Sequence, residues 1–154
     1  MRKNYFYDSD IIFADYQTIF DVIIDVEKYP DFLKWCKKVQ IIKSQDKYIE
    51  AELNVVFKNI KASYISNITY SDPNDKGEIF IKVESSQGAF KHLFNLWTIT
   101  PQGKDKTKVS IKVEFEFKSS ILNYLLKLFY KQAQNEIIRL FRCRINTVYN
   151  TKKK

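Results

Sequence analysis

Glycine, proline, cysteine and histidine are all scarce in this chain. Three glycines, three prolines, two cysteines and one histidine occur among 154 residues. With so few turn-forming residues, we find no linker, low-complexity segment or internal repeat, and we expect one domain over residues 1–150 and a basic tail at 151–154. No run of about 18 or more apolar residues occurs, which excludes a membrane-spanning helix.

The scarce residues also limit the chemistry. Cys36 and Cys143 are far apart and form no CxxC motif, so we interpret them as free thiols of a reducing cytoplasm. His92 has no cysteine or carboxylate pair at metal-ligand spacing, and the GxSxG motif and phosphate-binding glycine loops are absent. We therefore expect no metal site, no catalytic residue, no cofactor and no enzyme activity. The N-terminus lacks the apolar core of a signal peptide.

Charge is the abundant feature. The net charge of +8 comes from lysines and arginines spread along the chain, including the final TKKK. Such a balance favours polyanionic partners, either acidic lipid headgroups or RNA, and does not choose between them. We do not expect DNA as a partner.

Hydrophobic periodicity predicts an α+β chain. A strand over 4–13 precedes two short helices, at 16–24 with Asp15 as its N-cap and at 26–35 with Pro30 in its first turns. From Val39 the period becomes two over six strands, and the last of these places Glu114 and Glu116 on the solvated face. A long helix follows over about 119–149. Its apolar stripe comprises Leu122, Leu126, Phe129, Ala133, Ile137, Phe141 and Val148.

This order predicts a curved antiparallel sheet of about seven strands, with the long helix laid across its concave face. The motifs VEKYPDFLKWC, AELNVVFKNIKASYISNI, GAFKHLFNLWTITP and VEFEFKSSIL, and the later FRCRINTVY, occur in the order found in one family. The chain resembles the START-like, helix-grip superfamily of polyketide cyclases and lipid-transport proteins. Within it, the motifs are similar to the branch of coenzyme Q-binding proteins and the bacterial ribosome association toxin. Lys34, Asn59 and Ala89 depart from the family's proline, glycine and proline.

The resemblance implies a hydrophobic cavity between sheet and helix that holds ubiquinone or a similar prenyl lipid as ligand. The amide of Asn95 could hydrogen-bond a quinone oxygen, although a satisfied structural amide is an equal interpretation. The remaining ligand-binding candidates are apolar or aromatic. They are Phe32, Leu33, Trp35, Val55, Phe57, Tyr64, Trp97, Phe115, Phe117, Leu122, Leu126 and Phe129.

The stretch YPDFLKWC, residues 29–36, has two interpretations. Its aromatic side chains could form a lid or a membrane-facing lip, with Lys34, Lys37 and Lys38 contacting anionic lipid or RNA. Alternatively, Phe32, Leu33 and Trp35 merely anchor a short helix to the core.

Two functions stay open at this stage. The first is a non-catalytic quinone-binding protein that supports quinone delivery to the respiratory chain. It would be cytoplasmic and peripheral at the inner face of the bacterial inner membrane. The second is a ribosome association toxin-like protein that binds the large ribosomal subunit and blocks its joining with the small one. The net charge of +8 suits rRNA phosphates as well as anionic lipid.

Overall fold

The computed structural model describes residues 4–153, and the side chains of residues 129–131 lie outside the described set. The order of its elements confirms the predicted fold class. That order is β1 (Asn4–Ile12), α1 (Tyr16–Ile24), the 3-10 helix η1 (Val26–Asp31), β2 (Cys36–Gln45), β3 (Tyr48–Phe57), β4 (Ile60–Tyr70), β5 (Ile79–Gly88), β6 (Phe90–Gly103), β7 (Lys106–Phe117) and α2 (Ser120–Lys152).

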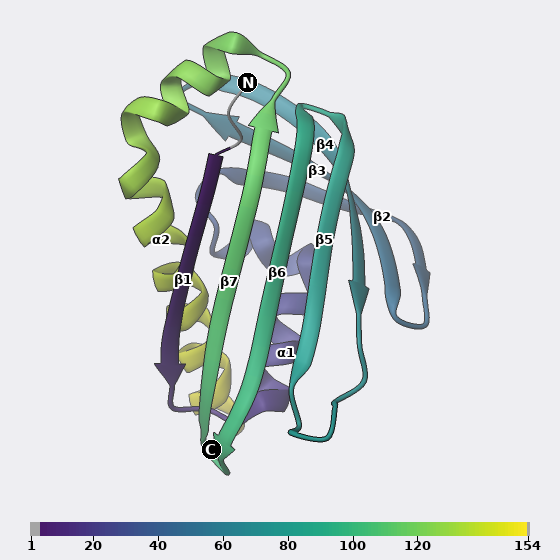
Figure 1. The fold of residues 1–154 in the computed structure, drawn as a ribbon, viewed down its shortest axis with the longest axis vertical. Coiled ribbons are helices and arrows are strands. Elements are labelled where there is room, and N and C mark those ends of the chain that lie inside the picture. Colours follow the sequence, from purple (N-terminus) through teal and green to yellow (C-terminus); the bar gives the residue numbers. More distant parts are fainter. Residues whose placement is uncertain (1–3, 154) are drawn as a thin grey trace.

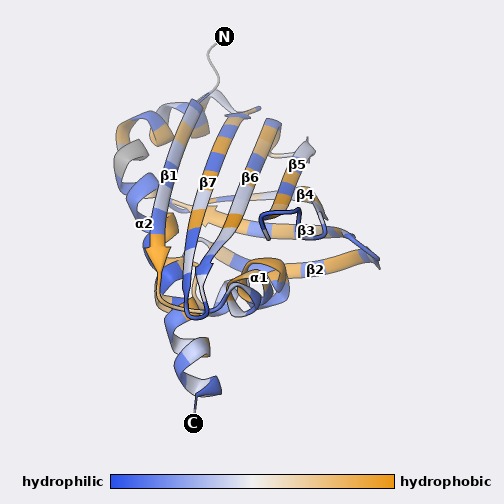
Figure 2. Ribbon diagram, turned by 60° about the horizontal axis from the view of Figure 1, so that its bottom comes forward, coloured by the Kyte–Doolittle hydropathy of each residue, from blue (hydrophilic) through white to orange (hydrophobic). Residues whose placement is uncertain are grey.

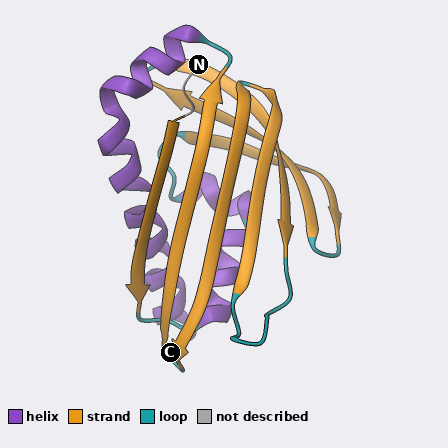
Figure 3. Cartoon of the chain, viewed as in Figure 1, coloured by secondary structure: helices purple, strands orange, loops and turns teal. Residues whose placement is uncertain are grey.

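The strands form one seven-stranded antiparallel sheet with the order β1-β7-β6-β5-β4-β3-β2. The sheet bends strongly, so that β2 and β3 run at a steep angle to β1 and β7 (Figure 2). The helices α1 and α2 lie on the same, concave side of the sheet (Figures 1 and 3). There α2 contacts α1, β1 and β7. The long helix thus covers the concave face, as the periodicity predicted.

Side-chain caps fix where both α-helices begin. The Asp15 carboxylate accepts hydrogen bonds from the Thr18 backbone N–H at 3.1 Å and from the Thr18 hydroxyl at 2.6 Å. The Ser119 hydroxyl accepts from the Leu122 N–H at 3.2 Å, and this makes Ser119 the N-cap of α2. Each cap satisfies a backbone donor that the helix itself leaves unpaired. The predicted cap at Asp15 is therefore confirmed.

The second short helix is shorter and tighter than predicted. The structure has a 3-10 helix over Val26–Asp31 in place of a helix over 26–35. Pro30 lies inside it and supplies no backbone N–H, which favours one short, tight turn over a continued α-helix. Residues 32–35 form a bend instead, and the Leu33 N–H bonds to the Tyr29 carbonyl at 2.8 Å.

The core lies between the concave face and the helices. The alternation predicted for the last strand is confirmed as far as Phe115, since Val109, Ile111 and Val113 are buried while their neighbours are more exposed. The stripe predicted for α2 was incomplete because it omitted Ile145, which is fully buried. This part of α2 packs against α1 as well as the sheet, and so it buries a wider face than one stripe. No helix in the described chain combines the length and apolarity needed to cross a bilayer.

The position of Glu116 differs from the prediction. The sequence places Glu114 and Glu116 together on the solvated face, yet only 7% of Glu116 is exposed. A bulge in β6 between Phe90 and His92 places an extra residue opposite this part of β7. Lys91 Nζ consequently lies 3.7 Å from the Glu116 carboxylate, so the buried charge has a cationic neighbour.

Replacing Ile145 by alanine should lower the free energy of unfolding by about 2–5 kcal/mol, because the variant leaves a cavity between α2 and its neighbours. Ile121→Ala on the same helix is the matched control, since Ile121 is 64% exposed, and it should change stability by less than about 0.5 kcal/mol. Urea unfolding followed by circular dichroism measures both. Equal losses for the two variants would contradict this packing.

Candidate functional site

The bend at residues 29–36 is the first part of the site, and its rings pack onto α2. Phe141 of α2 makes edge-to-face contacts with Tyr29 at 5.4 Å, Phe32 at 5.2 Å and Trp97 at 4.9 Å between ring centroids. We call these four residues the bend cluster. The Tyr29 hydroxyl also donates to the Ile23 carbonyl at 2.5 Å. The bend is therefore tied to α1, α2 and β6 together.

The other bend candidates also lie against the core. Leu33 is 5% exposed, and Phe32 and Trp35 are partly buried against the core. The Trp35 carbonyl accepts from the Val56 N–H at 2.9 Å, which fixes the bend to β3. These contacts agree with the interpretation that the stretch anchors a short helix to the core. A contact of the same residues with a ligand stays a prediction.

A second aromatic group, the strand cluster, comprises Tyr64, Phe90, Phe115 and Phe117. Tyr64 meets Phe90 edge-on at 4.8 Å, and Phe90 stacks on Phe117 at 4.7 Å. Gly88 permits this arrangement, because its φ of +87° suits glycine and a Cβ there would lie 2.6 Å from the Tyr64 Cα. The predicted residues Tyr64, Phe115 and Phe117 are thus brought together from β4 and β7.

Asn95 lies between the two clusters along β6. It occupies the concave face between Leu93, whose cross-strand partner is Phe115, and Trp97. Its Oδ1 is buried and has no hydrogen-bond partner among the described residues. Yet Asn95 as a whole is only partly buried, and so is Val83, its cross-strand partner on β5. The protein therefore leaves a small part of its own concave face uncovered here.

The remaining residues predicted to bind ligand fall into a buried pair and a partly buried pair. Leu122 and Leu126 of α2 are buried, at 5% and 8% exposure. Val55 and Phe57 of β3 are partly buried. The side chain of Phe129 lies outside the described residues, so its predicted role is neither supported nor contradicted.

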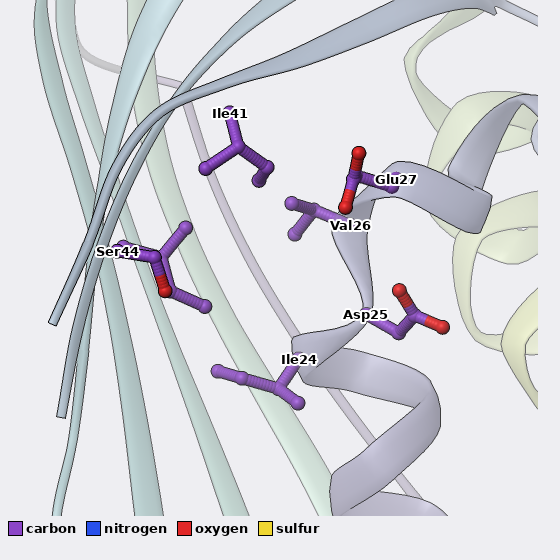
Figure 4. A pocket seen from close by; sticks show the side chains of 7 residues that line it. Ile24, Asp25, Val26, Glu27, Ile41 and Ser44 are labelled. Atoms are coloured by element: carbon purple, nitrogen blue, oxygen red, sulfur yellow. The ribbon is translucent and has the colours of Figure 1, made fainter. Parts of the chain in front are cut away.

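Two open clefts flank η1, and neither is lined by Asn95 or by the strand cluster. One, of about 360 Å³, is lined by apolar side chains from α1, β2 and β3, with Asp25 and Glu27 of the η1 segment beside them (Figure 4). The other, of about 460 Å³, follows the bend. Only the second contains residues predicted for ligand or polyanion contact, namely Phe32, Leu33, Lys34 and Lys37.

The interior beneath the bend is electrically neutral. Burial raises the pKa of the Tyr29 and Tyr64 hydroxyls above their usual value of 10.0, and the proximity of other ionisable groups raises both further. Burial also raises the pKa of the Cys36 thiol to about 11. All three groups stay protonated at neutral pH. Cys36 is thus a poor nucleophile, and the concave face suits an uncharged guest.

The lysines predicted to contact polyanions differ in their surroundings. Lys34 Nζ bonds to the Glu136 carboxylate of α2 at 3.0 Å, and Arg139 binds the same carboxylate at 2.8 Å. These two cations hold the pKa of Glu136 below its usual value. Lys37 and Lys38 are exposed at the start of β2. Lys34 therefore joins the bend to α2, while Lys37 and Lys38 face solvent.

The sheet creates one polar pair that sequence reasoning missed. His92 Nε2 lies 3.6 Å from the Glu114 carboxylate across the β6–β7 ladder. Only the register of two strands, not spacing along the chain, reveals this pair. Within the described chain, no three histidine, cysteine or acidic side chains gather as a metal site.

We expect one thiol of the folded protein to react quickly with a thiol reagent and the other to react slowly. Cys143 is exposed, whereas Cys36 is buried with a pKa of about 11, so that at about pH 8 only about one Cys36 in a thousand is thiolate. A chromogenic disulfide reagent should label one thiol rapidly and the second only after unfolding. Cys143→Ser should abolish the fast phase and leave the slow one. A fast phase that survives in Cys143→Ser would overturn the buried placement of Cys36.

Comparison with known proteins places the whole arrangement in a family. Residues 12–142 match the family model described as "Polyketide cyclase / dehydrase and lipid transport". The "Ribosome association toxin RatA" of Rickettsia prowazekii is 27% identical over 130 residues, which cover 84% of this chain and 88% of that protein. The "Coenzyme Q-binding protein COQ10, mitochondrial" of Dictyostelium discoideum is 29% identical over 136 residues, which cover 86% of this chain and 64% of that protein.

A solved structure shares the fold. The STAR-related lipid transfer protein from Xanthomonas axonopodis superposes with a TM-score of 0.78, covering 92% of this chain and 85% of that one. Its sequence is 13% identical, so the likeness concerns the fold alone.

Proposed function

The chain belongs to the polyketide cyclase / dehydrase and lipid transport family, and from this premise we propose that it binds a hydrophobic ligand on its concave face. The ligand is ubiquinone or a similar prenyl lipid, and the protein carries it without changing it. The relative named as a coenzyme Q-binding protein supports the choice of ligand.

The observation that carries this proposal is the uncovered position at Asn95. A buried acceptor without a partner costs about 1–3 kcal/mol, so a ligand whose hydroxyl donates to Asn95 Oδ1, as that of a quinol can, gains that energy on binding. An amide offers a donor to a quinone carbonyl and an acceptor to a quinol hydroxyl. Asn95 can therefore serve either redox form of the head by turning its amide.

The surroundings suit the isoprenoid tail. The bend cluster and the strand cluster lie on either side of Asn95 along β6 and present ring faces and edges rather than charges. Each buried CH₂ group of a prenyl chain is worth about 0.8 kcal/mol, so a few carbons against these rings contribute several kcal/mol. The cleft that follows the bend contains Phe32 and Leu33, which suit contact with such a tail. In this function the protein supports quinone delivery to the respiratory chain at the membrane.

Among the described residues, we find no group on the concave face that is placed for acid–base chemistry. Tyr29, Tyr64 and Cys36 are protonated at neutral pH, because their ordinary pKa values lie above 7 and burial raises them further. His92 and Glu114 pair with each other, and neither lies beside Asn95 in the strand register. Carriage, rather than catalysis, is thus the activity we assign.

Protein purified from its native cells should yield a quinone in an organic extract analysed by mass spectrometry. Purified protein should also bind added ubiquinone, and Asn95→Leu should weaken that binding up to about tenfold by removing one hydrogen-bonding group. Thr98→Val, near Asn95 on β6 but on the other face, is the matched control and should bind as wild type. Binding that is absent in the wild type, or unchanged in Asn95→Leu, would count against the site.

A second function has its own support. The relative named as a ribosome association toxin aligns over most of its length, and this chain carries a net charge of +8. Exposed Lys37 and Lys38 would then contact rRNA phosphates on the large ribosomal subunit in a salt-dependent way.

Sedimentation of ribosomes with added protein tests this second function. It predicts co-migration at low salt and a loss of 70S particles, because the bound protein blocks subunit joining. Lys37→Glu with Lys38→Glu should reduce co-migration. Lys104→Glu with Lys106→Glu, equally exposed at the β6–β7 turn, is the control. Unchanged 70S levels without co-migration would remove the ribosomal function.

A further inference from the structure

The first turns of α2 are apolar on two opposite sides. Leu122 and Leu126 are buried on one side. Ile121, Tyr124 and Leu128 lie on the other, exposed by 64%, 63% and 59%. Their spacing of three and four residues places them on one side of the helix, and we call them the α2 stripe. Three large apolar side chains in a row on a helix surface are costly in water and mark a surface that binds something.

The charges around the α2 stripe are all positive. Residues 118–135 contain Lys118, Lys127 and Lys131, and neither aspartate nor glutamate. The side chains of Lys118 and Lys127 are exposed, and no carboxylate pairs with either in the described part of the chain. A partner of the α2 stripe must therefore combine negative charge with an apolar interior.

The rest of this end of the molecule adds to the positive charge. The Lys118 N–H bonds to the Ala89 carbonyl at 2.9 Å, and the Ala89 N–H bonds to the Ser63 carbonyl at 2.8 Å. The start of α2 therefore lies beside the β5–β6 turn and the start of β4 (Figure 1). Exposed Lys61 comes from β4, while Lys91 of β6 is offset by the Glu116 carboxylate 3.7 Å away. Basic side chains thus surround the end of the molecule at which α2 begins.

We infer that the α2 stripe docks on an anionic lipid bilayer. Ile121 and Leu128 enter the boundary between headgroups and acyl chains, Tyr124 lies at the interface with its hydroxyl toward water, and Lys118 and Lys127 contact lipid phosphates. In this orientation, the helix that covers the proposed ligand face lies against the membrane. This inference rests on the proposed carrier function. Docking gives the carrier a membrane surface on which it exchanges its ligand.

Other occupants fit the α2 stripe less well. A symmetric dimer through this face would bring Lys118 and Lys127 of one copy toward the same residues of the other, and like charges would repel. RNA would take up the lysines, yet it would leave Ile121 and Leu128 in water, because aliphatic side chains do not stack on bases as aromatic ones do. An anionic bilayer offers phosphates to the lysines and an apolar interior to Ile121 and Leu128.

Vesicle flotation with the full chain tests the inference. Wild type should float with phosphatidylcholine vesicles that contain phosphatidylglycerol, more weakly at high salt, and poorly with phosphatidylcholine alone. Ile121→Gln combined with Leu128→Gln should reduce the bound fraction at least about tenfold, because the apolar area that enters the bilayer is removed. Ile42→Gln on β2 is the matched control, since Ile42 is 51% exposed, and it should float as wild type.

Three results would overturn the inference. They are wild type that does not float, a double variant that floats like wild type, and a loss in Ile42→Gln as large as in the double variant. A drop in molar mass by light scattering in the double variant would assign the α2 stripe to a second copy instead. Ubiquinone binding by the double variant should equal that of wild type, so failure to dock and failure to bind ligand are told apart.

Discussion

The packing of Phe141 holds the functional part of this molecule together. This one ring contacts Tyr29 and Phe32 from the bend and Trp97 from β6, so α2, the bend and the sheet meet at a single point. The ion pair between Lys34 and Glu136 joins the bend to α2 a second time, at the surface. The abundance of aromatic side chains at this bend follows from its task of anchoring the long helix over the concave face.

That anchoring determines what the concave face can do. Rings fill it near the bend and near the ends of β6 and β7, while Asn95 and Val83 between them stay partly uncovered. Because burial keeps Tyr29, Tyr64 and Cys36 protonated, the space is neutral. In the proposed function, the amide orients the polar head of the ligand and the apolar tail supplies most of the affinity.

The proposed carrier function and the proposed docking surface share one helix. The inner side of the first turns of α2 buries Leu122 and Leu126, while its outer side presents Ile121, Tyr124 and Leu128. Lys118 and Lys127 supply the charge that an anionic surface attracts. If both proposals hold, one helix covers the ligand face with its inner side and meets lipid with its outer side.

Sequence by itself determined the elements and most of their boundaries. Alternation marked Val109, Ile111 and Val113 as inward, and Asp15 marked the start of α1, because alternation and caps are local in the chain. The family motifs then predicted how the elements assemble, and the structure confirms that assembly.

Only the tertiary structure decided which side chains meet. The 3.6 Å approach of His92 to Glu114 and the burial of Glu116 depend on the register of β6 and on its bulge, which spacing along one strand does not encode. The full burial of Ile145 depends on α1 packing against α2 as well. The unpartnered amide oxygen of Asn95 likewise results from how side chains of distant elements pack on the concave face, since packing depends on volume in space rather than on order in the chain.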